Sequence, residues 1–317
     1  MNKTSWTLDQ APSQAGKVAL ITGANIGLGY ETALGLAQKG AKVILACRNE
    51  ARGQQALNAL MAAVPGAELE LVIVDLSSLA NVRRCAEALN AKLPRLDLLI
   101  NNAGIMMPPR SLSEDGFESQ FAANYTGHFL LTSLLLPLLE KSSSKSAPAR
   151  VVSLSSAAHN WGEIYFDDLT FDKAYSTRKS YGQSKLACLM FAYELDRQLQ
   201  KRASTVLSVA AHPGISVTNL GRFMPSIVQS LSSLIFQSAA RGALPTLYAA
   251  TGHDIDGGDY CGPNGWQEMS GNACKVDSSS ASKDLAVAER LWVLSQTLTQ
   301  GDFFPSTNTS AQPVHEV

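Results

Sequence analysis

The chain has 317 residues, of which 45% are hydrophobic and 17% charged, and its formal net charge is −1. This length supports one large core, and the near-neutral charge excludes the basic field that binds nucleic acid or anionic lipid. No apolar run approaches the roughly 18 residues of a membrane helix, so we expect no integral membrane segment and no nucleic-acid partner. The five cysteines form no CxxC pair, which indicates reduced thiols and a cytoplasmic protein.

The first predicted unit is a strand, a glycine turn and a helix. The apolar run Val18–Ile21 is followed by a turn with Gly23, Gly27 and Gly29, and then by a helical repeat of Tyr30, Ala33, Leu34 and Ala37. Glycine allows a ligand to approach the backbone, and the first turn of a helix offers free N–H groups to a phosphate. Taken alone, this stretch is also typical of a tight turn without a ligand.

The same alternation continues along the chain. Further strand patterns lie at Lys42–Cys47, Leu69–Val74, Leu96–Ile100, Val151–Leu154, Val206–Ala211 and Tyr260–Gly262. The longest helical patterns run from about Glu114 to Glu140 and from about Ser180 to Leu199, and a short one covers Leu291–Leu298. The alternation predicts an α/β fold: a single-domain, Rossmann-like, doubly wound parallel sheet of about seven strands with helices on both faces.

Distinctive residues follow six of these strands. They are the glycine turn Gly23–Gly29, Arg48, Asp75, Asn101–Gly104, Ser155-Ser156 and Pro213-Gly214. The carboxyl ends of parallel strands meet at one edge of the sheet, where ligands bind in open α/β folds. We therefore expect one site at this edge.

Tyr181 and Lys185 stand four residues apart on a helical pattern and share its inward face. A nearby ammonium stabilises the phenolate form of a tyrosine, so the pair can exchange a proton with an alcohol oxygen. Ser155 or Ser156 can hold that oxygen. The alternatives are a half-buried tyrosine capped by a snorkelling lysine, and a serine pair that only forms a turn.

Asn124 lies on the inward face of its predicted helix and needs hydrogen-bond partners there. It either ties down a backbone kink or holds a buried water, and the two interpretations are compatible. His128 and His212 have no partner at metal-ligand spacing and are interpreted as structural, so we expect no metal site.

These motifs together resemble the short-chain dehydrogenase/reductase family, most of all its branch of retinol dehydrogenases and related carbonyl reductases. The resemblance covers about Lys17 to Thr218 and rests on these segments: Thr22-Gly23-x3-Gly27-x-Gly29, Asn101-Asn102-Ala103-Gly104, Ser156, Tyr181-x3-Lys185 and Pro213-Gly214.

The resemblance implies a role for each matching residue. Tyr181 is the expected acid/base, Lys185 supports it and holds the nicotinamide ribose, Ser156 polarises the carbonyl, and Asn124 completes a proton relay through a water. The implied cofactor-binding residues are Gly23, Asn25, Ile26, Gly27, Leu28, Gly29, Arg48, Asp75, Leu76, Asn102, Ala103, Gly104, Tyr181, Lys185, Pro213, Gly214, Ile215 and Thr218. Family membership also implies a homodimer or homotetramer.

The second strand ends in Arg48, with no acid beside it. An acid at this position accepts the ribose hydroxyls of NAD, whereas the fork of an arginine suits the 2′-phosphate of NADP. The sequence therefore predicts NADP(H) as the cofactor. The alternative is a surface charge that pairs with Glu50.

The segment after Pro213 is rich in apolar residues, and we interpret about 215–252 as a mobile substrate lid. Ordinary helix packing fits its spacing equally well. A loop over Trp161–Phe171 is expected to border the substrate. The chain then divides into a leader (1–16), an NADP-binding domain (17–300) and a flexible C-terminal tail (301–317).

The sequence thus predicts an NADP(H)-dependent oxidoreductase that interconverts a carbonyl, aldehyde or ketone, and an alcohol on a lipophilic small molecule, with Tyr181 as acid/base. Two alternatives stay open. One is a catalytically weak nucleotide-binding regulator. The other is a related enzyme of different chemistry, an epimerase or a double-bond reductase.

Overall fold

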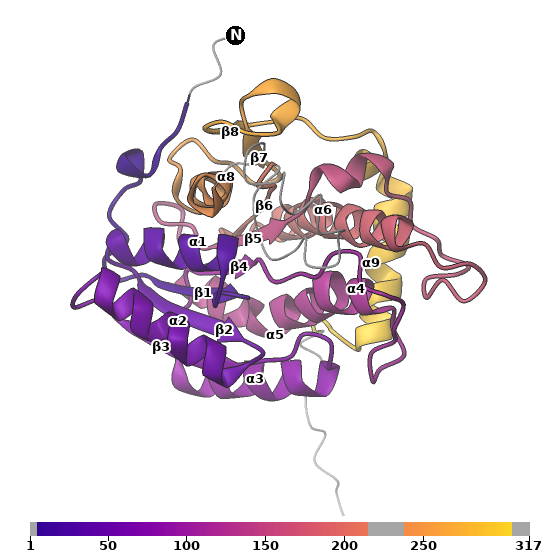
Figure 1. Cartoon of the computed structure of the whole chain (residues 1–317), viewed down its shortest axis with the longest axis horizontal. Coiled ribbons are helices and arrows are strands. Elements are labelled where there is room, and N and C mark those ends of the chain that lie inside the picture. Colours follow the sequence, from indigo (N-terminus) through magenta and orange to yellow (C-terminus); the bar gives the residue numbers. More distant parts are fainter. Residues whose placement is uncertain (1–4, 215–237, 306–317) are drawn as a thin grey trace, which may run out of the picture.

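A computed structural model describes residues 5–214 and 238–305 and shows one eight-stranded sheet between two helical layers (Figure 1). The strand order is β3-β2-β1-β4-β5-β6-β7-β8, and all neighbours are parallel except β7 and β8. The strands are β1 (Val18–Thr22), β2 (Lys42–Cys47), β3 (Leu69–Ile73), β4 (Leu98–Asn101), β5 (Arg150–Leu154), β6 (Leu207–Ala211), β7 (Tyr260–Pro263) and β8 (Ala273–Lys275). The predicted doubly wound α/β fold is confirmed.

Helices cover both faces of the sheet, each over its own apolar core. One face carries α1 (Gly27–Gln38), α2 (Glu50–Ala63) and α8 (Ala239–Thr251). The other carries α3 (Leu79–Lys92), α5 (Gly127–Ser142) and α6 (Thr177–Lys201), with α9 (Leu285–Thr299) packed outside α5 and α6. Within the described residues, no helix combines the length and apolarity that crossing a bilayer requires.

Strand β8 is absent from the sequence prediction. It is three residues long and pairs antiparallel with β7, so no alternating pattern of useful length marks it. The leader supports it: the Trp6 N–H donates to the Ala273 carbonyl at 3.0 Å, and the Trp6 ring lies 5.4 Å from that of Tyr248. Residues 5–16 therefore belong to the folded body.

The predicted helix from Glu114 begins later than expected. Gly116 has φ +82°, which ends any helical path there, and the Glu118 carboxylate accepts the N–H groups of Gln120 and Phe121 at the start of α4 (Ser119–Phe121). A π-helical segment, Ala122–Thr126, joins α4 to α5. Such segments often occur at functional sites, and this one contains Asn124.

The lid prediction is wrong for residues 239–251. These residues form α8, whose Leu247 and Tyr248 are buried against α1 and the sheet. Gly35 of α1 gives the close approach, since a Cβ there would lie 2.9 Å from Leu247 Cδ1. For residues 239–251 the alternative of ordinary helix packing is therefore correct. Residues 215–237 of the predicted lid lie outside the described residues.

The tail prediction is wrong at its start. Phe303 is 3% exposed, and its ring centroid lies 4.6 Å from that of Trp292 and 5.0 Å from that of Phe129. After α9 ends, the contacts of Phe303 with Trp292 and Phe129 hold the chain against α5. The remaining residues of the predicted tail, 306–317, lie outside the described residues.

Replacing Phe303 by Leu is expected to lower the free energy of unfolding by about 1–2 kcal/mol, because the ring contacts with Trp292 and Phe129 are lost. Urea denaturation measures the change. Phe304→Leu is the control, since that ring is only half-buried, at the margin of the same core, and packs on the Arg202 guanidinium. Equal losses in the two variants would contradict the placement of Phe303 in the core.

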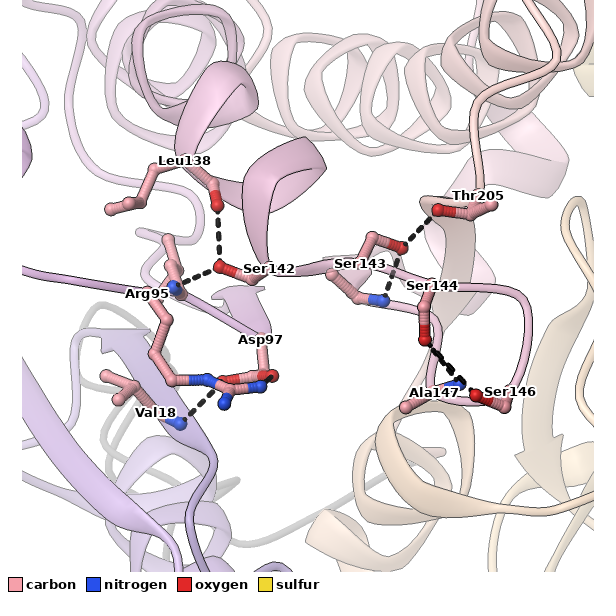
Figure 2. A network of polar contacts seen from close by, with 12 residues as sticks. Val18, Arg95, Asp97, Leu138, Ser142, Ser143, Ser144, Ser146, Ala147 and Thr205 are labelled. Carbon is pink, nitrogen blue, oxygen red and sulfur yellow. Dashed lines mark hydrogen bonds and ion pairs between the residues drawn. The ribbon is translucent and has the colours of Figure 1, made fainter.

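A polar network ties the elements together at the amino edge of the sheet (Figure 2). The Asp97 carboxylate accepts the Val18 N–H at 2.9 Å and pairs with Arg95. The Ser142 hydroxyl accepts the Leu96 N–H at 2.8 Å and donates to the Leu138 carbonyl at the end of α5. These bonds hold the amino edge of the sheet, opposite the edge at which the parallel strands end.

Candidate active site

The glycine turn between β1 and α1 has a backbone that only glycine fits. Gly23 and Gly27 have φ +66° and +59°, and a Cβ at Gly23 would lie 2.9 Å from Ala103 Cα. A Cβ at Gly29 would overlap the Gly23 carbonyl. Ile26, the N-cap of α1, makes no side-chain cap bond, so the first turn of α1 presents its N–H groups and positive dipole end to an anion.

Thr22 joins the ends of β1 and β4. Its Oγ1 accepts the N–H groups of Asn102 and Ala103, both at 2.9 Å, and its carbonyl accepts Asn102 Nδ2 at 2.6 Å. The Asn102 amide therefore holds the turn and the Asn101–Gly104 loop together. This loop forms the wall of the glycine turn opposite α1.

Asn124 fastens the π-helical segment to the same loop. Its Oδ1 accepts the Ile105 N–H at 2.8 Å, and its Nδ2 donates to the Ile105 carbonyl at 3.0 Å and to Ser184 Oγ at 2.9 Å. The structure thus shows the predicted tie to a backbone kink. Gly104 lies beside it, since a Cβ there would lie 3.2 Å from Asn124 Oδ1 and 3.6 Å from Lys185 Nζ.

Tyr181 and Lys185 lie on the inward face of α6, and each is 6% exposed. Lys185 Nζ donates to the Leu154 carbonyl at 3.0 Å, and Ser155 Oγ donates to the Lys185 carbonyl at 2.8 Å. Both bonds seat this turn of α6 on the end of β5. The snorkelling alternative is wrong, because the ammonium is buried against a backbone carbonyl and does not reach solvent.

Ser156 caps a 3-10 helix, Ala157–Trp161, directly after β5. Its Oγ accepts the Ala158 N–H at 3.2 Å, which leaves the hydroxyl hydrogen free to be donated. The loop that follows rests on α6, since a Cβ at Gly162 would overlap the Gly182 carbonyl. Ser156 and Tyr181 therefore lie on neighbouring elements at one edge of the sheet.

Three residues of the expected cofactor-binding set, Arg48, Asp75 and Leu76, follow the ends of β2 and β3. Arg48 is exposed, and among the described residues it forms no ion pair, so the predicted alternative of a pair with Glu50 is not seen. The Asp75 carboxylate accepts both the N–H and the hydroxyl of Ser77, at 2.9 and 2.6 Å. Leu76 is buried, with its carbonyl against Gly127 of α5.

The end of β6 carries another glycine with a positive φ. Gly214 has φ +66° and donates its N–H to His212 Nδ1 at 3.3 Å, while His212 Nε2 lies 3.1 Å from Glu268 Oε2. His212 therefore has the structural role that the sequence predicts. Ile215 and Thr218 lie outside the described residues.

None of the five cysteines forms a disulfide, and four of them are buried. Burial raises the pKa of the Cys47 thiol to about 11, which keeps it protonated and unreactive at neutral pH. The described residues contain no cluster of three or more His, Cys, Asp or Glu side chains that could hold a metal ion.

Comparison with known proteins identifies the family. The family model described as short chain dehydrogenase matches residues 17–226. Retinol dehydrogenase 12 of Mus musculus is 41% identical over 285 residues, which cover 88% of this chain and 85% of that protein. Polyprenol dehydrogenase of Danio rerio is 37% identical over 294 residues, which cover 91% and 88%.

Solved structures agree with this assignment. An uncharacterised protein of Mycobacterium paratuberculosis has 38% identity and a TM-score of 0.78, over 95% of this chain and 100% of the other. The Pseudomonas aeruginosa RhlG/NADP complex has 28% identity and a TM-score of 0.62, over 78% and 94%. The chain therefore belongs to the short chain dehydrogenase family and is an oxidoreductase of its retinol dehydrogenase branch.

Proposed function

We propose that this protein interconverts a carbonyl and an alcohol on a lipophilic small molecule with NADP(H). The observation that carries the proposal is the turn of α6 with Tyr181 and Lys185, buried on the end of β5 at the same sheet edge as the glycine turn. The names of two relatives, a retinol and a polyprenol dehydrogenase, support an apolar alcohol as substrate.

The residues present fit a dinucleotide. A Cβ would fill the cradle at Gly23 and Gly29, and the first turn of α1 directs its N–H groups towards that cradle. Exposed Arg48 at the end of β2 suits a 2′-phosphate. When bound, the nicotinamide supplies or accepts the hydride.

The side chains of this protein donate and accept the proton. In the reducing direction the Tyr181 hydroxyl gives its proton to the substrate oxygen, and in the oxidising direction the phenolate takes it back. The Lys185 ammonium stabilises the phenolate, because its described partner, the Leu154 carbonyl, leaves its positive charge unpaired. Ser156 donates its hydroxyl hydrogen to the same oxygen while its lone pair keeps the Ala158 N–H.

A panel of apolar aldehydes and ketones, with small polar sugars beside it, tests the proposal through NADPH oxidation. We expect turnover of the apolar carbonyls. Turnover confined to the sugars would contradict the lipophilic substrate, and NADPH binding without any turnover would favour the nucleotide-binding regulator. We further propose a cytoplasmic protein, since the five cysteines form no disulfide, and a homodimer or homotetramer.

Replacing Arg48 by Asp is expected to weaken NADPH binding by about tenfold or more and to shift preference towards NADH. The change removes a cation that suits the 2′-phosphate and adds a carboxylate that repels it. Dissociation constants for both cofactors, from quenching of protein fluorescence, measure the shift. Arg52→Asp is the matched control, because Arg52 is also exposed but lies within α2. An unchanged NADPH constant in Arg48→Asp would refute the assignment.

A further inference from the structure

We propose that His128 is a positioning residue that couples the π-helical segment of Asn124 to the glycine turn through Thr22. His128 is 3% exposed and stands in the first turn of α5, directly after that segment. The inference rests on the proposed function only where cofactor binding is measured. The hydrogen bonds of His128 can be tested without any cofactor.

The first contact runs to the backbone of Asn124. His128 Nδ1 lies 2.9 Å from the Asn124 carbonyl oxygen, and Cys188 Sγ donates to the same oxygen at 3.2 Å. A carbonyl oxygen only accepts hydrogen bonds, so Nδ1 carries the imidazole proton. The side chain of Asn124 holds Ile105 and Ser184, and His128 thus fixes the main chain of the residue that orders this side of the site.

The second contact follows from the first. With the proton on Nδ1, His128 Nε2 presents a lone pair, and the Thr22 hydroxyl lies 2.8 Å from it and donates its hydrogen. The competing acceptor for that hydrogen is the Ile100 carbonyl, which lies farther away at 3.3 Å. The imidazole therefore decides which way the Thr22 hydroxyl turns.

The direction of the Thr22 hydroxyl decides where its lone pairs point. In the structure they receive the N–H groups of Asn102 and Ala103, both at 2.9 Å. If the hydrogen turned to the Ile100 carbonyl, the lone pairs would turn away from these two N–H groups. The Asn101–Gly104 loop, one wall of the glycine turn, would then lose the bond from the Ala103 N–H, and the Asn102 N–H would keep only its second bond, to the Ile100 carbonyl at 2.9 Å. The glycine turn would then hold a dinucleotide less firmly, because one of its walls would be less well fixed.

Burial and the charge of Lys185 keep the imidazole neutral. Burial lowers the pKa of His128 to about 4, and the Lys185 charge acts in the same direction. A protonated ring would place an N–H on Nε2 and reverse the bond to Thr22. A histidine that only filled space would need neither a fixed tautomer nor these partners.

Nitrogen-15 NMR of the imidazoles in the cofactor-free protein tests the tautomer directly. We expect His128 to carry its proton on Nδ1, with a bare Nε2, from about pH 8 down to about pH 5. A proton on Nε2, or titration of His128 within that range, would overturn the proposal. This readout needs no substrate and no cofactor, so it is independent of the proposed function.

Three substitutions separate coupling from packing. His128→Gln keeps an acceptor that reaches Thr22, His128→Asn keeps only the donor near Asn124, and His128→Phe keeps the ring volume but neither bond. We expect the dissociation constant for NADPH to stay within about twofold of the wild type in His128→Gln, and to rise about tenfold in His128→Asn and His128→Phe. NADH is titrated in parallel, in case it is the cofactor.

A pure packing role predicts a different order. His128 borders a cavity of about 10 Å³, and a shorter side chain would enlarge it. On packing alone, His128→Phe would be the mildest change and His128→Asn the most severe. Cofactor affinity in that order would overturn the proposal. Combining His128→Asn with Thr22→Val gives a second check: we expect no further loss beyond the single variants, whereas additive losses would show that the two residues act separately.

Discussion

Replacing Tyr181 by Phe is expected to lower kcat/KM for an apolar carbonyl by at least about 10²-fold, with NADPH binding retained. The variant removes one hydroxyl from a side chain that is 6% exposed and keeps its volume. General acid–base groups contribute roughly 10²–10⁴-fold to turnover, and loss of the proton donor removes that contribution. Initial rates of NADPH oxidation under saturating cofactor measure the effect.

Tyr193→Phe is the matched control for this variant. Tyr193 stands on the same helix, and its hydroxyl donates to Ser278 Oγ at 2.9 Å, away from the carboxyl ends of the strands. We expect its kcat/KM to stay within about twofold of the wild type. If Tyr181→Phe turned over as fast as the control, Tyr181 would not be the acid/base.

Replacing Arg150 by Met is expected to lower the free energy of unfolding by about 3 kcal/mol. Arg150 is 8% exposed at the start of β5, and its guanidinium donates to the Ala249 and Gly252 carbonyls at 2.9 and 2.8 Å. These carbonyls end α8, where a cation also offsets the helix dipole. Met keeps the aliphatic stem but leaves two buried acceptors without a donor, at about 1–3 kcal/mol each.

Urea denaturation of the wild type and of Arg150→Met measures this loss, as a lower midpoint concentration of urea with an unchanged dependence of the unfolding free energy on urea concentration. Arg241→Met is the control, because Arg241 is exposed on the same helix α8. We expect its stability to stay within about 0.5 kcal/mol of the wild type. Equal stability of the two variants would show that the Arg150 bonds are replaced by water in the folded protein.

The strands and the ligand edge could be predicted because their signals are local. Val18–Ile21 and Lys42–Cys47 are apolar runs followed by turn residues, and they form β1 and β2. Once the sheet is parallel, the strand ends must share an edge, so Gly23, Asn102 and Ser156 lie along it without any long-range signal.

The parts that failed depend on contacts between distant segments. The apolar pattern of residues 239–251 is the same for a lid and for a buried helix, and Gly35 of α1 decides between them by letting Leu247 approach. Phe303 follows a helix that ends at Thr299, so its sequence position suggests a free tail, and Trp292 and Phe129 instead hold it in the core.

The sequence by itself determined the succession of strands β1 to β7, the residues that follow the first six of them, and the shared face of Tyr181 and Lys185 on α6, because periodicity and turn preference act over a few residues. Only the tertiary structure decided the hydrogen-bond partners. Thr22 and His128 lie 106 residues apart in the chain, and their bond exists because α5 packs beside β1 and β4. No local pattern encodes such a pair, since its geometry is set by packing across the sheet.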